Sequence, residues 1–572
     1  MQQSCKKVKK VKYVNGNLYE IILYIEAKKA IGSKIFISES ESYRSLEEEL
    51  ISPEVWNRDK EIILSSLTDR VVSLSFEEIL RPMEAMLEKL YTAVNARIQN
   101  GTNKHIKVDA KNNTWKLPYE KQNEEVNNPL FDKMPVMDLV DVISYVAEQT
   151  GFMEHFTHIL SKNVKSSPKL EHLIAYAVAS GTGLGKGRIV QGSDVTQEEL
   201  NTLERNFIRL ETLKNTNNGI INKVAELAIF KHFNLSEYGV HASVDGQKIT
   251  TRYQTVTARY STKYYGKAVG VVAFSLIANH LPINSIIISP NNHESHYLVD
   301  IYLNNNSNIK PIAISGDMHS INRFNGGLLN LLKCQFMPRF TKIYKTATKD
   351  LVGFKDRSQY GRMLIKPVSQ ADKPFIRSEW DSIMRIVASL AKKQSSQSTI
   401  IRKLSAYKAN PTLKALAQYD KIVMSIYLLN YIDDINVRRT VQKALNRGEA
   451  FHQLRAALMK ISGKQLQGRT EFEIAISNEC NRFLAICIIY YNCILLSFLL
   501  ESLDKEKDKE LYELITRLSP VAWQHINMIG KFQFLQNKKS IDIKAFIDDL
   551  MADLKKDFKP LRSQKKAYNK NS

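Results

Sequence analysis

The stretch that decides the fold is YGVHASVDGQKITT, residues 238–251, in which small and apolar residues lead to Asp245 and then Gly246. A carboxylate at the end of a buried strand, beside a glycine that lets a ligand approach the backbone closely, suits a divalent cation. An Asp-Gly pair also marks ordinary tight turns, and taken alone this stretch favours the turn. The metal-site interpretation therefore depends on further carboxylates downstream.

The surrounding sequence predicts an α/β core inside a mostly helical chain. Between residues 240 and 340 lie β-branched runs punctuated by Gly, Pro and Asn, with a helix-like HESHYLVDIYL before the last run. Helical patterns fill most of the rest, apart from a hairpin pattern at 105–119. We therefore predict an α+β protein. The runs are VHASVD, YQTVTARY, AVGVVAFSLIA, SIIIS and IKPIAIS.

Length and charge narrow the class of partner. A chain of 572 residues is too long for one core, so several domains are expected. The formal net charge of +22 favours a polyanionic partner, most simply nucleic acid, although an anionic membrane surface would also attract it. Five cysteines without a CxxC pair argue against a disulfide framework or zinc site and fit a reducing cytoplasm.

Two segments resemble functional motifs, but we interpret both as structural. The apolar run 483–500 is long enough to raise the question of a membrane span, yet its polar residues favour a buried core helix, and we expect no membrane partner. SGTGLGKGR, residues 180–188, resembles a phosphate-binding loop, but Ser180 occupies the first glycine position and a helical pattern precedes it. We interpret it as a glycine-rich helix end and turn.

Two further carboxylates strengthen the metal-site interpretation. Asp317 follows the apolar run IKPIAIS and Gly316, in the same setting as Asp245. Glu449 lies in the helical pattern ALNRGEAFHQLRAAL, on one face with Asn446 and Gln453. Two aspartates and a glutamate form an oxygen-rich site for two Mg²⁺ ions, which suits in-line phosphoryl transfer. Each carboxylate also has a structural alternative (a cap, a turn or a surface ion pair), which for Glu449 alone is the more common case.

Six motifs follow one another along the chain: Val244-Asp245-Gly246-Gln247, Arg259–Gly266, Ser315–His319, Phe336–Arg339, Leu445–Ala450 and Leu518–Asn527. In this order they resemble S-D-G-Q, R-Y-S-P-K-Y-F-G, T-D-T-x-G, F-x-P-R, L-N-K-G-E-A and L-S-P-x-x-W-x-H-I-N, the motifs of the catalytic part of the Tn-three family of replicative transposases. The resemblance spans roughly residues 140 to 535. Thr262 replaces the usual proline, and Asp317 lacks its usual threonine neighbour.

This resemblance implies a DDE site in an RNase H-like fold with a long helical insertion before the glutamate. It implies Asp245, Asp317 and Glu449 as catalytic residues and as ligands of two Mg²⁺ ions, for which Mn²⁺ substitutes. Glu479 resembles a family position that is not a dependable carboxylate, so it is set aside as the third ligand. Family members are longer and bind inverted repeats through an N-terminal portion, so we expect a truncated chain.

The expected partner is DNA, both transposon ends and target, and the expected active form is a homodimer in the bacterial cytoplasm at the nucleoid. Arg259, Lys263 and Lys267 interleave with tyrosines near the first aspartate and are predicted to contact DNA, as is Arg447; a solvated basic face is the alternative. Three functions remain open: a metal-dependent strand transferase, a non-catalytic DNA-binding or regulatory fragment, and a stand-alone RNase H-like nuclease or junction resolvase.

These interpretations divide the chain into six expected parts. They are an upstream remnant with a basic N-terminus (1–60), a mostly helical domain with a hairpin (61–237), the RNase H-like core with both aspartates (238–350), a helical insertion (351–444), a helical completion of the core with the glutamate (445–535) and a basic C-terminal tail (536–572).

Overall fold

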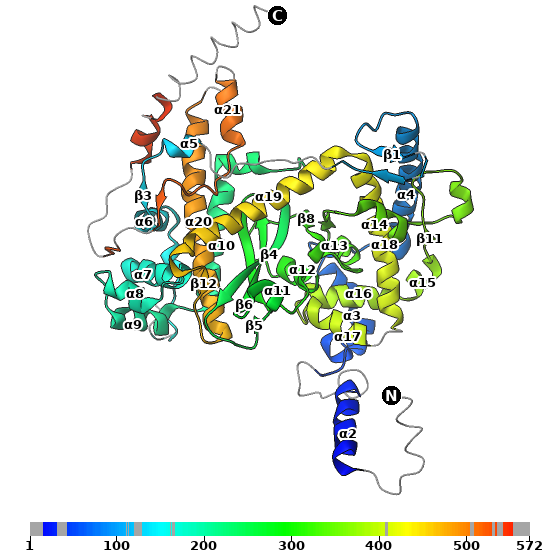
Figure 1. Ribbon diagram of the computed structural model, residues 1–572, viewed down its shortest axis with the longest axis horizontal. Helices are drawn as coiled ribbons and strands as arrows, with labels where there is room; N and C mark the ends of the chain where they lie inside the picture. The colour runs from blue at the N-terminus through cyan, green and yellow to red at the C-terminus, as the bar shows by residue number, and fades with distance from the viewer. Residues whose placement is uncertain are drawn as a thin grey trace, which may run out of the picture.

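The structure is a computed structural model, and it has the predicted α+β character: one central sheet lies among helices (Figure 1). It describes residues 15–30, 43–109, 111–112, 114–118, 129–160, 162, 166–406, 410–503, 508–528, 532–534, 542–548 and 550–552.

The central sheet is mixed. β4 (His241–Thr251) pairs antiparallel with β6 (Val269–Ala278), which pairs antiparallel with β7 (Leu281–Ile288). On its other side β4 pairs parallel with β8 (Ala313–Gly316), and β8 with β9 (Gln335–Phe336). Short β5 (Arg259–Tyr260) and β12 (Gln465–Leu466) extend β6 and β4. Every residue of β6 is buried, because helices cover both faces of the sheet.

The lengths of three strands differ from the sequence patterns for identifiable reasons. β7 begins at Leu281, four residues before the predicted run SIIIS, because it follows β6 directly in a hairpin. The turn residues of this hairpin, Asn279 and His280, both have positive φ, of 45° and 71°. β8 begins only at Ala313, after Pro311, which lacks the N–H that a ladder needs. Only the last two residues of the predicted run YQTVTARY find a partner strand.

Helices on one side of the sheet pack around α20 (Glu471–Glu501), as the orange ribbon of Figure 1 shows. Within the described residues this helix alone is long and apolar enough to cross a membrane, and 94% of its most apolar window is buried in the protein. The prediction of a core helix at 483–500 is confirmed. The other elements here are α5 (Pro129–Asp132), α6 (Leu139–Thr150), α7 (Leu170–Gly181), α8 (Lys186–Gln191), α9 (Gln197–Phe207), α10 (Leu210–Glu226), α21 (Lys509–Thr516), β3 (Met137–Asp138) and β13 (Ile526–Asn527).

Helices on the opposite side pack around α18 (Pro411–Asp433). α3 starts at Pro53, and the Ser52 side chain caps it by accepting a hydrogen bond from the Val55 N–H. The elements here are α3 (Pro53–Ser65), α4 (Phe76–Gln99), α14 (Ile343–Asp350), α15 (Lys373–Ser378), α16 (Trp380–Ala391), α17 (Gln397–Ala406), β10 (Val352–Gly353) and β11 (Ser369–Gln370). α2 (Gly16–Ala30) projects away from this side (Figure 1).

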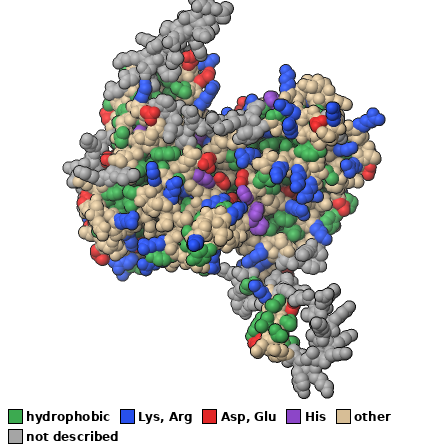
Figure 2. Space-filling model, in the orientation of Figure 1, with side chains coloured by type: hydrophobic (Ala, Val, Ile, Leu, Met, Phe, Trp, Pro, Cys, Tyr) green, Lys and Arg blue, Asp and Glu red, His purple; other side chains and the backbone are tan. Residues whose placement is uncertain are grey.

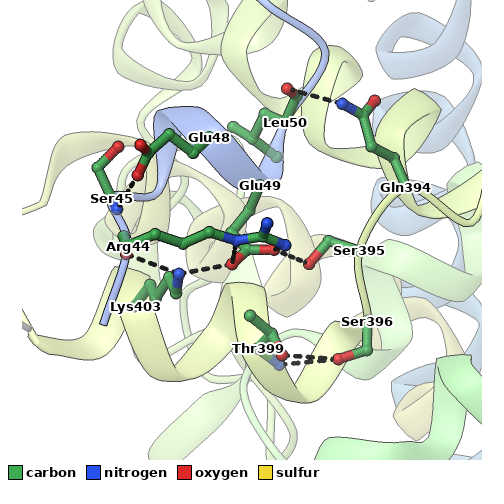
Figure 3. Close-up of polar contacts among 10 residues, drawn as sticks. All are labelled: Arg44, Ser45, Glu48, Glu49, Leu50, Gln394, Ser395, Ser396, Thr399 and Lys403. Carbon is green, nitrogen blue, oxygen red and sulfur yellow. Dashed lines mark hydrogen bonds and ion pairs between the residues drawn. The ribbon is translucent and has the colours of Figure 1, made fainter. Parts of the chain in front are cut away.

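The segment 44–50 is anchored to this side by a buried ion pair (Figure 3). Glu49 accepts hydrogen bonds from Arg44, from Ser395 and from Lys403 of α17, at 2.6 to 2.7 Å. Nearby, Gln394 donates to the carbonyl of Leu50. The region expected as an upstream remnant is therefore packed, in part, against the region expected as the helical insertion.

Several local predictions can be compared directly with the structure. β1 (Lys107–Asp109) and β2 (Thr114–Lys116) form the predicted antiparallel hairpin. The glycine-rich segment ends α7 and turns into α8, and Lys186 there pairs with Glu204. Cys334, Cys480, Cys487 and Cys493 are buried free thiols.

Two expected boundaries differ from the observed elements. α19 (Ile435–Leu458) runs without interruption across the boundary expected between 444 and 445. The expected basic tail lies mostly outside the described residues, but residues 543–548 are helical and Ile543 and Ile547 are buried. The apolar residues of this described part therefore pack into the core.

Candidate active site

Asp245 lies on the central strand β4, and its position corrects the strand-end expectation. β4 continues to Thr251, and antiparallel pairing with β6 keeps Asp245 opposite Ser275 and Gly246 opposite Phe274. The Asp-Gly pair is therefore held extended by its neighbour strand and does not form a turn. Gly246 is required for another reason: a Cβ atom there would lie 2.4 Å from Oε1 of Glu294.

Asp317 directly follows β8, as predicted. The parallel register pairs Val244 with Gly316, so Asp245 and Asp317 are the next residues on adjacent strands, whose spacing is about 5 Å. Asp317 Oδ1 accepts a hydrogen bond from the His319 backbone N–H at 2.8 Å, and Oδ2 lies 2.7 Å from His319 Nδ1. These contacts fix the Asp317 carboxylate beside the central strand.

Helix α19 brings the third carboxylate over the same strand. Gln247 of β4 donates to the backbone carbonyl of His452 at 2.9 Å, which fixes the helix against the sheet. The ligand atoms of Asp245, Glu449 and His452 lie within 4.8 Å of one another. Figure 2 shows acidic and histidine side chains gathered near the centre of one face of the molecule.

The surroundings alter the protonation of this cluster. Burial, followed by the negative charges of Glu294 and Asp317, raises the pKa of Asp245 to about 6, against a hydrogen bond from Gly246 that lowers it. Burial, together with Arg455 and Lys248, lowers the pKa of His452 to about 3, so its imidazole is neutral. Neutral imidazole and carboxylate oxygen are both ligands of divalent cations.

An unsatisfied nitrogen atom of His452 is a second reason why these residues suit a divalent cation. His452 Nε2 is buried and has no hydrogen-bond partner among the described residues, and Nδ1 lies 3.6 Å from Oδ2 of Asp245. A polar ring atom left unsatisfied inside a protein is costly unless a ligand or water completes it. A bound cation would likewise stabilise the ionised form of Asp245, whose pKa is raised.

Three residues of this site, His452, Lys248 and Glu294, were not predicted from the sequence. Glu449 and His452 form a Glu-x-x-His pair, whose spacing puts both side chains on one helix face, and this signal was available in the sequence. Glu294 is 7% exposed and accepts from Lys248 Nζ at 2.7 Å, while Lys248 also donates to the Gly246 carbonyl. No local pattern links Glu294 to Lys248, because they meet only through tertiary packing.

Comparison with known proteins identifies the family. The family model described as Tn3 transposase DDE domain matches residues 141–532, more than half of the chain. The chain belongs to this family. The chain is 24% identical over 523 residues to the transposase for transposon gamma-delta of Escherichia coli K12, covering 87% of this chain and 50% of that relative. It is 25% identical over 540 residues to the transposase for transposon Tn1546 of Enterococcus faecium, covering 92% and 52%.

A third relative extends the comparison to another bacterial source. The transposase for transposon Tn4556 of Streptomyces fradiae is 22% identical over 515 residues, covering 88% of this chain and 56% of the relative. The chain thus spans about half the length of the curated relatives it matches.

The predicted DNA-contact residues of this Tn3-family chain separate into two groups. Lys263 and Lys267 are exposed on the segment between β5 and β6, and Arg259, which lies in β5 itself, is half-buried. The Tyr264 ring lies 4.8 Å from Lys263 Nζ and 5.5 Å from Lys248 Nζ, which connects this segment to Asp245's surroundings.

Arg447 does not belong to this surface. It is 8% exposed, and its guanidinium donates to the Phe233 carbonyl at 2.7 Å and approaches Asn279 Oδ1 at 3.4 Å. Because α19 turns this residue toward the β6–β7 turn, the expected DNA contact of Arg447 is corrected to a role in packing. Glu479, set aside from the sequence, is also buried and accepts from Arg482 at 2.6 Å.

Proposed function

We propose that this protein is a DDE transposase that nicks DNA at transposon ends and joins the 3′ ends to target DNA. The observation that carries the proposal is the meeting of Asp245 and Glu449 in one cluster with His452, with Asp317 on the adjacent strand. Two aspartates from neighbouring strands and a glutamate from a crossing helix suit phosphoryl transfer without a protein nucleophile.

Asp245, Asp317 and Glu449, with His452 beside them, are the residues that would hold the metal. Two Mg²⁺ ions, for which Mn²⁺ substitutes, would activate the attacking water or 3′-hydroxyl and stabilise the leaving oxygen. Lys248 neutralises Glu294, so the cluster carries less excess negative charge toward an approaching phosphate. Lys263 and Lys267, with Tyr260 and Tyr264 between and beside them, would position the strand by phosphate contacts and base stacking.

The central sheet is consistent with the RNase H-like core that the motifs imply. An antiparallel meander, β4, β6 and β7, is continued by parallel β8 and β9. In this order the central strand carries Asp245, and the strand beside it leads into Asp317. We propose that residues 238–350 and α19 together form this core, and that the helices between them are the family's insertion.

The test is a nicking and joining assay on DNA that carries the terminal inverted repeats of the element, with Mg²⁺ or Mn²⁺. Asp245→Asn, Asp317→Asn and Glu449→Gln should each abolish product while leaving the far-ultraviolet circular dichroism spectrum unchanged. Glu510→Gln, an exposed carboxylate on α21, is the matched control and should retain activity. The proposal fails if the wild-type protein forms no product, or if the three variants remain active.

A second candidate is a non-catalytic DNA-binding regulator, since the formal net charge of +22 accounts for DNA binding without any catalysis. Such a regulator would bind DNA but form no product with either metal, and its addition would inhibit a full-length transposase. We further propose that the protein acts on DNA in the bacterial cytoplasm and that its active form is a homodimer. Light scattering of the DNA complex measures its mass and so tests the homodimer directly.

A further inference from the structure

A second concave site lies beside the carboxylates and has the opposite charge. We call it the arginine pocket: Arg339, Arg438, Arg439 and Gln442 line it together with the aromatic residues Phe340 and Tyr431. Its volume is about 370 Å³, within the range of pockets that hold small ligands. No acidic side chain is among its lining residues in the described part of the chain.

The charge of Arg339 is the feature that points to a ligand. Within the described part of the chain, its guanidinium makes one hydrogen bond, of 3.3 Å, to Gln442 Oε1, and its buried Nε has no partner. Arg339 forms no ion pair with any carboxylate in the described ranges. A partly buried guanidinium without a counter-ion is costly, and a planar array of donors matches a phosphate group.

The neighbouring lining residues differ in their present contacts. Arg438 donates to the carbonyl oxygens of Tyr431 and Ile432 at 2.8 and 3.0 Å, so it also closes the C-terminal end of α18. Arg439 is exposed at the mouth of the pocket. The rings of Phe340 and Tyr431 meet edge to face, with centroids 5.5 Å apart, and form the apolar side.

Backbone and side-chain contacts connect the arginine pocket to the active site. The Arg339 backbone N–H donates to the carbonyl of Gly316, the residue before Asp317, at 2.9 Å. Gln442 donates to Asn446 on α19, and Glu449 follows on the same helix face. Gln442 and Glu449 are seven residues apart on α19, so the pocket lies about 10 Å along this helix from Glu449.

We propose that the arginine pocket holds one unpaired nucleotide of the DNA strand that is cut, and this rests on the proposed function. The phosphate would lie against Arg339 and Arg439, and the base against Phe340 and Tyr431. A bare phosphate would not need the aromatic side, and a base that remains stacked in a duplex cannot enter a pocket of this volume. The strand would thereby be fixed on one side of the cleavage point.

The test measures DNA binding without chemistry, by fluorescence anisotropy in EDTA. One labelled strand is presented alone, in a full duplex, and in a duplex with a short central mismatch bubble. The wild-type protein should bind the single strand and the bubble more tightly than the full duplex. Arg339→Gln and Arg439→Gln should each weaken binding of these two unpaired probes about tenfold and binding of the full duplex less than about twofold.

Two further variants make the result specific. Arg357→Gln removes an exposed arginine outside the pocket and should leave all three affinities within about twofold. Phe340→Leu keeps an apolar side chain but removes the ring, and it should also weaken binding of the unpaired probes. Thermal unfolding of each variant verifies folding, and Arg439 is exposed, so its replacement removes no core contact.

Three outcomes would overturn the inference. The arginine variants could bind unpaired DNA like the wild type, they could weaken all three probes equally, or Phe340→Leu could have no effect, which would leave a phosphate site alone. Failure of the proposed function looks different: the wild type would bind none of the probes, or Asp245→Asn would leave nicking unchanged in the separate assay with metal.

Discussion

His452 contributes a nitrogen donor to the cluster formed by Asp245 and Glu449. Replacing it by glutamine keeps a polar side chain but removes the imidazole lone pair that a cation or water would use. We expect His452→Gln to lower nicking about 10–100-fold and to raise the Mg²⁺ concentration for half-maximal activity. His155→Gln, at an exposed histidine that ends the 3-10 helix Phe152–His155, is the control and should leave the metal requirement unchanged. An unchanged metal requirement would exclude His452 from the metal site.

Gly246 permits the close approach of Glu294 and Val272 to β4. A Cβ atom at this position would lie 2.4 Å from Glu294 Oε1 and 2.6 Å from Val272 Cγ1, and the Val272 backbone is held in the sheet. We expect Gly246→Ala to lower the free energy of unfolding by about 1–3 kcal/mol, measured by urea denaturation. Gly187→Ala, where a Cβ meets nothing within 4 Å, should be neutral or stabilising. Equal effects of the two substitutions would contradict this explanation.

At the residue scale, the sequence contains part of the candidate site. Asp317 could be predicted because apolar residues end abruptly before it, and Glu449 because its helix is periodic. Asp245 was identified, but its place within β4 was not, because Gly246 and Lys248 interrupt the strand pattern and only pairing with β6 keeps them extended. The contact of Lys248 with Glu294 joins residues too far apart in sequence for any local pattern to reveal.

At the scale of an element, the ion pair of Glu49 holds the 3-10 helix Glu47–Glu49 against α17, and its contribution to stability depends on pH. Burial alone would raise the pKa of Glu49, but hydrogen bonds from Arg44, Lys403 and Ser395 outweigh it and lower the pKa to about 2. Because the pKa is lower in the folded protein than the ordinary value of 4.5, this stabilisation is complete above about pH 4.5 and is lost as pH falls toward 2.

We therefore expect Glu49→Gln to lower the free energy of unfolding by about 3 kcal/mol at pH 7, since the substitution also leaves Lys403 buried without its carboxylate. The difference from the wild type should shrink as the pH is lowered toward 3, as chemical denaturation at several pH values would show. Glu48→Gln, the exposed neighbour in Figure 3, should change stability by less than about 0.5 kcal/mol. A difference independent of pH would exclude the ionised pair as the cause.

Elements with a strong local period could be predicted, and elements defined by tertiary pairing could not. The hairpin at 105–119 and the buried helix at 483–500 follow from turn residues and from continuous apolar sequence. The sequence prediction placed a domain boundary at residue 444, but α19 is continuous there. One helix belongs both to the region around α18 and to the region that crosses the sheet, and no local pattern shows that two regions share a helix. Its function depends on this continuity, since one rigid helix connects the arginine pocket to Glu449.

At the scale of the whole molecule, the net charge of +22 predicts that DNA affinity depends strongly on salt. The exposed pair Lys263 and Lys267 lies beside the candidate active site, so we expect it to contact two phosphates. Replacing both by glutamine should reduce the slope of log affinity against log salt concentration by about 2, measured by anisotropy on duplex DNA.

The matched control removes the same charge elsewhere, with Lys169→Gln and Lys231→Gln. These are two exposed lysines on the side of the molecule that packs around α20. If only total charge matters, both double variants should weaken binding to the same degree and show the same salt dependence. If Lys263 and Lys267 bind phosphates directly, only their replacement should flatten the salt dependence. Equal slopes for the two double variants would therefore remove the segment 259–267 from the DNA interface while leaving the assignment of the three carboxylates unchanged.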